Sequence, residues 1–353
     1  MTREIQPLAE NDLPELSRFL TAGFHAPADA PFASPEVLRW KFLRAEGGPD
    51  SPPLSYVARD DDSGAIVGHV GTCRTAFLGR GIEAPVETLH MIDWLGSRGH
   101  PSVGSSLMRK AHAAAPTQFG LGGSNAGRAV IERGGYDLVA QIPVYQKVLH
   151  VRYWFHAGGL TTAQRIPRIA REIVRQSLDS FRARPDSNLP IGSQPVTSFG
   201  AEIGPIVEEA AAHAVLTDRS PDRLNAFLKF PGRSMTGWHL FDLQRRLRGF
   251  AILNIVPQDG GKTKVGKIVD CLLDTDAPDL WAGAVASLTL VLECLGAEIA
   301  QGYAGTPWLA SAFEADGYST RFALDFRLRD RAGRVPREGP FHIMPIEADY
   351  AYT

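Results

Sequence analysis

The sequence has little cysteine, no long apolar run and almost no net charge. Its three cysteines, Cys73, Cys271 and Cys294, lie singly in 353 residues, without the spacing of a zinc site or a disulfide framework, so we expect no metal and a reducing, cytoplasmic compartment. No stretch approaches the roughly eighteen apolar residues of a transmembrane helix, and the N-terminus lacks a signal-peptide core. The net charge of -2 supplies no field that would attract nucleic acid.

The composition and length of the chain are those of a folded protein with more than one domain. The apolar share is 44% and the charged share 22%, as in ordinary globular proteins. A chain of 353 residues exceeds what one hydrophobic core usually serves. A stretch rich in Pro, Ser and Gly at 186–195 is typical of a linker. We therefore expect an N-terminal domain over 1–150, a connector over 151–195 and a C-terminal domain over 196–353.

For the first domain the sequence predicts strands and helices in the order β-α-α-β-β-β-α-β-α-β. Strands are expected near 3–7, 54–59, 66–77, 86–95, 117–122 and 138–149. Helices are expected after a cap at Asn11 or Asp12, after Ser34, and over 105–115 and 125–133. The turn at 60–64 indicates an antiparallel hairpin, whereas the later strand-helix alternation indicates parallel pairing. The prediction is an α/β fold in which each domain is a twisted mixed sheet flanked by helices.

The connector carries an amphipathic helix over 165–184. Its apolar side comprises Ile166, Ile169, Ile173, Val174, Leu178 and Phe181, with six arginines largely elsewhere. One interpretation is a connector that packs this stripe against one or both domains. The other is a basic helix in peripheral contact with a membrane, preceded by Tyr153, Trp154 and Phe155.

The second half of the chain repeats landmarks of the first at an offset near 180 residues. The matched segments are 34–38 with 220–224, 65–70 with 247–252, 90–95 with 267–272, and 129–136 with 311–318. Four matches in the same order indicate an ancient duplication, so we expect two tandem copies of one fold.

Three features give the sequence a resemblance to the GNAT acyltransferase superfamily: the opening segment 5–12, the strand-loop-helix around Gly104, and the helix that ends at Gly135 and Tyr136. It resembles most the tandem GNAT proteins found with bacterial exopolysaccharide functions. The resemblance implies an N-acetyltransferase-like enzyme that uses acetyl-CoA or a longer acyl-CoA. Its acceptor would be a small-molecule amine, with an amino sugar as one candidate.

The resemblance also implies a cofactor loop, where backbone N–H groups at the start of a helix bind the CoA pyrophosphate. With Gly104 as the last member of the family's loop pattern, Gly99 and Ser102 take the other two positions. Ser102 replaces a glycine only if its backbone stays out of the left-handed region. The candidate cofactor-binding residues are Leu95, Gly96, Ser97, Arg98, Gly99, Ser102, Val103, Gly104, Ser105 and Asn125, the last of which also caps its helix.

The second copy departs from this pattern. The segment 274–279 offers carboxylates where a phosphate would approach, and like charges repel. We therefore expect a degenerate C-terminal domain with a structural or substrate-binding role.

Acyl transfer to an amine needs a base, and the resemblance places it on the strand before the loop, where His90 and Asp93 lie. They are three residues apart, so strand alternation predicts opposite faces. Asp93 has a counterpart in Asp270, which favours an architectural role, and a lone strand histidine is usually packed in the core. The family's usual acid, a tyrosine, is replaced by Ile131. Tyr136 or Tyr145 is the substitute if the geometry allows.

Three functions therefore stay open. The first is an acyl-CoA-dependent N-acyltransferase with the acceptor held between the two domains. The second is a catalytically inactive binding or scaffold protein of the same fold, and the third is an acyltransferase whose donor is an acyl-carrier protein.

Overall fold

The elements of the first half follow the predicted order closely. A computed structural model describes residues 4–43, 53–123, 125–156, 161–181, 189–232 and 234–347. The first half comprises β1 (Ile5–Pro7), α1 (Leu13–Gly23), α2 (Pro35–Phe42), β2 (Ser55–Arg59), β3 (Ile66–Gly79), β4 (Val86–Gly96), α3 (Val103–Ala114), β5 (Thr117–Leu121), α4 (Asn125–Arg133) and β6 (Asp137–Val148).

The second half follows a helical connector and has the same order apart from two additional strands, β8 (Val215–Thr217) and β14 (Phe341–His342). The connector holds α5 (Tyr153–His156) and α6 (Thr162–Phe181). The second half comprises β7 (Ile191–Val196), α7 (Gly204–His213), β8 (Val215–Thr217), α8 (Pro221–Leu228), β9 (Met235–Asp242), β10 (Leu247–Gln258), β11 (Thr263–Leu273), α9 (Pro278–Cys294), β12 (Ile299–Tyr303), α10 (Pro307–Ala315), β13 (Ser319–Asp330) and β14 (Phe341–His342).

The two halves share local chemistry as well as order. The Ser34 hydroxyl accepts the N–H of Val37 at the start of α2, and the Ser220 hydroxyl accepts that of Arg223 at the start of α8. Such caps satisfy N–H groups that the first turn of a helix leaves free. The first expected cap differs, because the Asp12 carboxylate accepts the N–H of Ala9 in the preceding turn and does not cap α1.

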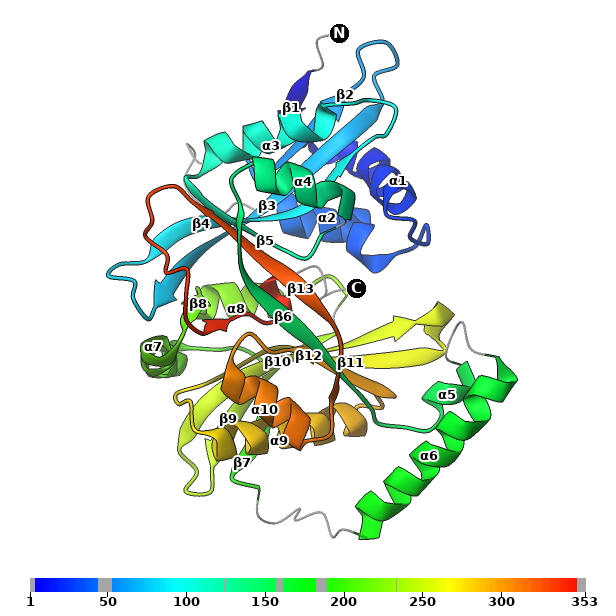
Figure 1. The fold of residues 1–353 in the computed structure, drawn as a ribbon, viewed down its shortest axis with the longest axis vertical. Helices are drawn as coiled ribbons and strands as arrows, with labels where there is room; N and C mark the ends of the chain where they lie inside the picture. Colours follow the sequence, from blue (N-terminus) through cyan, green and yellow to red (C-terminus); the bar gives the residue numbers. More distant parts are fainter. Residues whose placement is uncertain are drawn as a thin grey trace.

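The strands form one continuous mixed sheet (Figure 1), which confirms the predicted mixed α/β fold but joins the two sheets that were expected, one in each domain. Its order is β1-β2-β3-β4-β5-β13-β6-β12-β11-β10-β9-β7, with β8 and β14 off this path. A duplicated domain would be expected to keep its own last strand beside β5 or β12. Instead β13 pairs with β5, and β6 pairs with β12. The last strands of the two halves are therefore exchanged, and they pair with each other antiparallel in the middle of the sheet.

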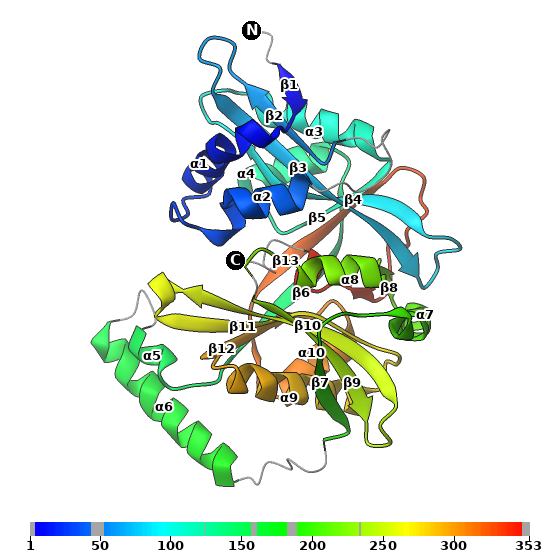
Figure 2. The ribbon, with the colours of Figure 1, turned by 180° about the vertical axis from the view of Figure 1, so that it is seen from behind.

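Helices cover both faces of the first half's sheet, as the front and back views show (Figure 2). Val57 of β2 packs in a cluster with residues of α1 and α2. Its neighbours Tyr56 and Ala58 pack in another cluster with residues of α3 and α4. Alternate residues of a strand point to opposite faces, so β2 is buried on both sides.

The two halves also pack directly on each other through a pair of helices. The Trp40 indole N–H of α2 donates to the Ala226 carbonyl of α8 at 3.2 Å. Its ring meets Phe227 and Phe230 edge-on, with centroids 5.6 and 5.5 Å away. The Trp40 contacts and the exchanged strands join the two halves.

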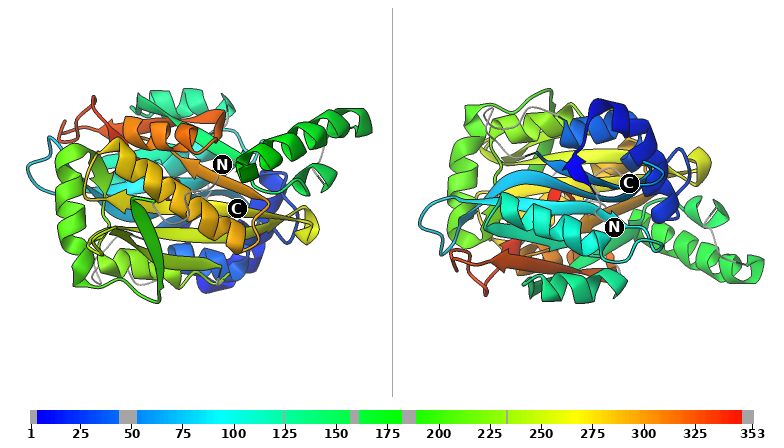
Figure 3. Two further views of the ribbon diagram at one scale, coloured as in Figure 1. Left: turned by 90° about the horizontal axis from the view of Figure 1, so that it is seen from below. Right: turned by 90° about the horizontal axis from the view of Figure 1, so that it is seen from above.

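The connector helix α6 projects from the body of the molecule (Figure 3). Ile166, Ile173 and Val174 on its apolar side are exposed, so the expectation that this stripe packs against the domains is wrong for these three residues. Among the described residues, no helix is long and apolar enough to cross a membrane.

Candidate functional site

The candidate site opens where β4 and β5 separate. These parallel strands pair only at Leu89 with Gln118 and at His90 with Phe119. β4 then continues to Gly96 while β5 ends at Leu121, and a cleft of about 1470 Å³ lies in this region. The split creates a binding space in the sheet without breaking the core of either half.

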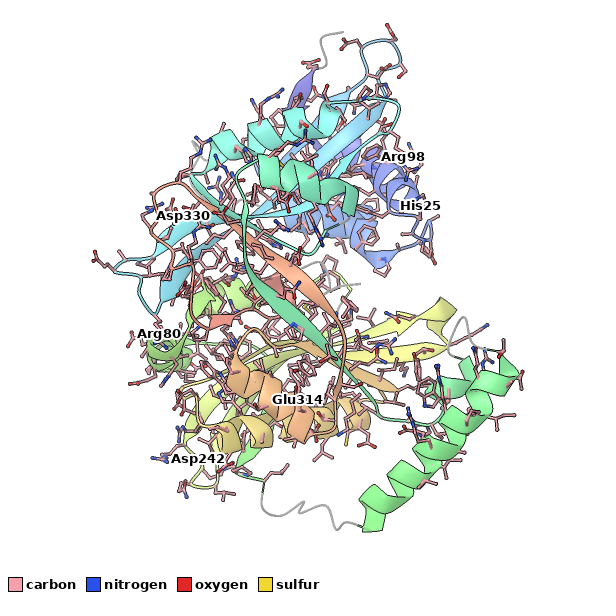
Figure 4. All side chains as sticks on the ribbon, viewed as in Figure 1. His25, Arg80, Arg98, Asp242, Glu314 and Asp330 are labelled. Carbon is pink, nitrogen blue, oxygen red and sulfur yellow. The ribbon has the colours of Figure 1, made fainter. Side chains whose placement is uncertain are left out.

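Both halves of the chain line this cleft. Figure 4 labels two of its residues, His25 and Arg98, which lie on the same side of the molecule. The first half contributes the end of α1, residues 90–98 and 100–105, and the glycines that follow β5. The exchanged strand β13 contributes Phe322, Ala323, Leu324, Asp325 and Arg327. The strand exchange thus completes a site that belongs mostly to the first half.

The loop between β4 and α3 leaves several backbone donors available. The N–H groups of Ser97, His100 and Val103 bond to the carbonyls of Val67, Ser97 and His100. Within the described chain we find no protein hydrogen-bond acceptor for the N–H groups of Arg98, Gly99, Ser102, Gly104 and Ser105. Arg98 and Gly99 lie in the loop before α3, and Ser102, Gly104 and Ser105 lie at the start of the helix, where the helix dipole favours negative charge.

Ser102 lies in the left-handed region, with φ 72° and ψ -10°, so the condition under which a serine replaces the glycine of the family's loop pattern is not met. This conformation costs a residue with a side chain roughly 1–2 kcal/mol. A left-handed residue beside a helical one turns neighbouring N–H groups to one side, which makes a concavity for anions. The strained residue Ser102 therefore lies among the backbone N–H groups that have no protein acceptor.

Gly104 is held closely against the end of β4. The Trp94 indole N–H donates to the Gly104 carbonyl at 3.0 Å. A Cβ atom built on Gly104 would lie 3.3 Å from Cζ2 of Trp94. The position therefore accepts glycine without strain and leaves little room for a larger residue.

Asp93 sits in a β-bulge of β4 with φ 48°. The β3–β4 register shifts there, from Gly71 opposite Ile92 to His69 opposite Leu95. The bulge interrupts the strand alternation on which the expectation of opposite faces rests, and residues of β4 from both sides of the bulge, His90 and Asp93 among them, line the cleft.

A buried polar network holds this bulge. The Lys41 ammonium donates to Oδ2 of Asp93 at 2.9 Å, and both side chains are buried. Nδ1 of His69 lies 2.7 Å from the Asp93 carbonyl and Nε2 lies 2.8 Å from the Ser55 hydroxyl. A His69 ring protonated on Nδ1 would donate to the carbonyl and accept from the serine. The contacts of Asp93 therefore fit the architectural alternative.

His90 lies at the point where the strands separate. Its ring stacks on Phe119 with centroids 4.5 Å apart and planes 7° apart, and the residue lines the cleft. The position of His90 fits both roles considered for it. The ring packs against Phe119 as a core histidine would, and it lies beside the space available to a ligand, as a catalytic base would.

The two candidate acids lie elsewhere. The Tyr136 hydroxyl donates to Oε1 of Gln118 at 2.7 Å, and burial raises the pKa of Tyr136 well above its usual range. The Tyr145 hydroxyl donates to Oε1 of Glu314 at 2.9 Å in the second half. Neither residue is among those that line the cleft. Asn125 is the first residue of α4, and its side chain is outside the described part of the structure.

Sequence reasoning missed the charged wall that β13 contributes. Arg128 of α4 pairs with Asp325 at 3.3 Å, and Arg327 pairs with Glu132 of α4 at 3.1 Å. These partners are about 200 residues apart in the chain. No local pattern signals them, because the contact exists only when the last strands are exchanged.

The corresponding region of the second half is occupied by internal ion pairs. Asp274 pairs with Arg248 at 2.8 Å. Asp270, the counterpart of Asp93, is buried against Arg219 at 2.9 Å, and Glu347 pairs with the same guanidinium. Burial raises the pKa of the Asp270 carboxyl, while the guanidinium opposes the shift. The carboxylates at the end of β11 thus hold the fold together.

Comparisons with known proteins reveal the fold of this chain but no close relative. No protein-family model and no curated protein matches the sequence. Among solved structures, the chain is similar to N-myristoyltransferase of Saccharomyces cerevisiae with bound myristoyl-CoA, at a TM-score of 0.64, 10% identity, and coverage of 93% of this chain and 82% of that chain. It is also similar to a GCN5-related N-acetyltransferase from Anabaena variabilis, at a TM-score of 0.57, 12% identity, and coverage of 93% and 73%. The chain therefore has the GNAT fold of N-acyltransferases.

Proposed function

We propose that this chain is an acyl-CoA-dependent N-acyltransferase whose acyl-CoA lies in the cleft between β4 and β5. The observation that carries the proposal is the group of five backbone N–H donors without a protein acceptor at the start of α3. Helix N-termini of this kind bind phosphate. A solved structure of similar fold holds myristoyl-CoA, which supports acetyl-CoA or a longer acyl-CoA as the co-substrate here.

The cleft is large enough for two substrates. Its volume of about 1470 Å³ exceeds the roughly 300–1,000 Å³ of ordinary ligand pockets. We assign the loop side to the donor, and the side bounded by α1 and β13 to a small-molecule amine acceptor between the halves. An amino sugar as that acceptor, and an association with exopolysaccharide functions, rest on the sequence resemblance. The cytoplasmic location rests on the scarcity of cysteine.

The reaction forms an amide bond and releases a thiol. The acceptor nitrogen attacks the thioester carbonyl carbon, the carbon-sulfur bond breaks, and the nitrogen loses a proton. We assign the acceptance of that proton, directly or through water, to His90. Asp93 is assigned to the architecture because its carboxylate already accepts from Lys41.

The backbone and the solvent complete this scheme. At the Asp93 bulge the backbone of β4 leaves its regular hydrogen-bonded ladder with β3. We place the thioester carbonyl oxygen, which gains negative charge during the reaction, beside this bulge. The departing thiolate takes its proton from water or from protonated His90, because neither tyrosine lines the cleft.

Calorimetric titration of the full chain with acetyl-CoA and with longer acyl-CoAs tests the donor site. We expect binding of at least one donor and at least a tenfold loss of affinity for the variant Gly104→Glu. The new side chain would meet Trp94 and place a carboxylate among the phosphate donors. Ala277→Glu is the control, because it adds the same carboxylate at the start of α9, the counterpart of α3, at a residue that does not line the cleft.

Each outcome of this titration decides between the functions considered. No heat with any acyl-CoA would overturn the donor proposal and favour a scaffold, or a carrier-protein donor if an acylated carrier binds instead. Binding that Gly104→Glu leaves unchanged would show that the loop is wrongly assigned. Binding without amide formation from any amine would leave an acyl-CoA-binding protein that has lost catalysis.

A further inference from the structure

The connector helices form a small unit that stands away from the body of the molecule. α6 extends outward in the views from below and above (Figure 3). The Arg165 guanidinium donates to the Phe155 carbonyl of α5 at 3.0 Å, and the Arg168 guanidinium lies 5.3 Å from the Trp154 ring centroid. α5 is therefore docked on the first turns of α6, and the two helices present one surface.

That surface exposes large apolar side chains. Ile166, Ile173 and Val174 of α6 are 61%, 51% and 58% exposed, and Phe155 of α5 is 54% exposed. Ile166 and Ile173 are two helical turns apart, so they lie on the same side of α6. Several exposed large apolar side chains on one pair of helices are typical of an interaction surface.

The same segment is strongly basic, although the chain is not. Residues 152–184 contain seven arginines and two carboxylates, whereas the whole chain has a net charge of -2. Arginines beside an apolar stripe are the pattern of helices that lie in a membrane interface. Aromatic residues such as Tyr153 and Trp154 are enriched at the same depth of a bilayer.

We propose that α5 and α6 bind the surface of a membrane that contains anionic lipids. The apolar side chains would enter the boundary between headgroups and acyl chains, and the arginines would contact lipid phosphates. Charge complementarity favours this occupant over a second copy of the chain. Two copies meeting through α6 would bring their arginines together, whereas an anionic surface neutralises them.

Binding through α6 would also bring the mouth of the cleft toward the lipid. His25 and Arg98, which line the cleft, lie on the side of the molecule from which α6 projects (Figure 4). Phe24 and Phe322 line the same cleft and are themselves exposed. A peripheral protein oriented in this way would reach a substrate that resides in the membrane surface.

Sedimentation of the full chain with lipid vesicles tests this proposal without any acyl-CoA. We expect binding to vesicles of phosphatidylcholine with 30% phosphatidylglycerol, and at least tenfold weaker binding to pure phosphatidylcholine. Raising the salt concentration to about 0.5 M should weaken the binding, because salt screens exposed charges. Failure to bind the anionic vesicles would overturn the proposal.

Two variants separate the apolar and the charged contributions. Ile166→Ser with Ile173→Ser, and Arg171→Gln with Arg175→Gln, should each reduce binding at least tenfold, and neither change removes the Arg165 and Arg168 contacts that hold α5 on α6. Leu243→Ser is the control, because Leu243 is equally exposed in another part of the chain. Circular dichroism and the melting temperature verify that each variant is folded.

Light scattering of the same proteins tests the second copy as the occupant. A wild-type dimer that becomes a monomer in the isoleucine variant, together with no vesicle binding, would show that α6 joins two copies and would overturn the membrane proposal. Equal binding of the wild type and both variants to anionic vesicles would also overturn it.

Discussion

The Lys41 ammonium lies 2.9 Å from Oδ2 of Asp93, and the two side chains are 0% and 2% exposed. This ion pair joins the end of α2 to the bulge of β4 at the wall of the cleft. Burying either charge alone would be costly, whereas the pair satisfies both. The second half has a corresponding solution, in which Asp270 of β11 is buried against Arg219. In both halves a cation near the second helix supports the strand that leads to the loop.

Removing one partner of this pair should destabilise the protein strongly. Lys41→Met leaves the Asp93 carboxylate buried without its cation, which costs about 3–5 kcal/mol. Chemical denaturation of the full chain measures the loss. The double variant Lys41→Met with Asp93→Asn should recover more than half of it, since no unpaired charge then remains buried.

The pair Lys147–Asp316 is the control for that experiment. Its atoms lie 3.1 Å apart, but the side chains are 16% and 18% exposed. Lys147→Met should therefore cost about 1 kcal/mol or less. A loss as small for Lys41→Met would contradict the role assigned to the buried pair.

Ser102→Gly should raise the melting temperature. Glycine adopts φ 72° without the steric cost that Ser102 bears, and the gain is about 0.5–1 kcal/mol after the entropy of glycine is subtracted. Acyl-CoA affinity should be retained, because the backbone donors stay in place. Ser105→Gly, inside α3, is the control and should lower the melting temperature. A fall in the melting temperature of Ser102→Gly would show that the serine side chain stabilises the loop.

His90→Gln should abolish most amide formation while donor binding persists. Loss of a general base lowers kcat by about 10²–10⁴, and the affinity for acyl-CoA measured by calorimetry should change by less than about twofold. His150→Gln, an exposed residue beyond β6, is the control. Normal turnover by His90→Gln would remove His90 from the proposed mechanism.

We predict that the stability of the folded protein depends on pH through the buried side chain of Lys267. It is the second-half counterpart of His90, and burial lowers its pKa from 10.5 to about 7. Between about pH 7 and 10.5 the unfolded chain therefore binds more protons at this residue than the folded chain, so its contribution to stability rises with pH across that window. The change over the whole window is a few kcal/mol.

Lys267→Met removes this dependence. The variant should melt above the wild type at pH 7, and the difference between the two melting temperatures should shrink as the pH approaches 10. Calorimetric scans at several pH values measure both. A difference that stays constant with pH would mean that Lys267 is charged in the folded protein.

The sequence predicted the local elements well because their signals are local. The caps at Ser34 and Ser220, the turn before β3 and the start of α3 depend on residues within one or two turns of each other. The loop at Gly104 was identified from the family resemblance of its strand-loop-helix segment. The contacts that hold the Asp93 bulge were not predicted, because Lys41, Ser55 and His69 come from three other elements that meet only in the folded core.

The sequence by itself determined the order of helices and strands in the first half and the place where a helix begins beside a glycine-rich loop. Only the tertiary structure decided which strand completes which half. β6 and β13 are both long extended segments, and the backbone hydrogen bonds offered by β5 do not depend on side-chain identity. Packing in the assembled core therefore selects the partner, and that choice brings Asp325 and Arg327 into the cleft.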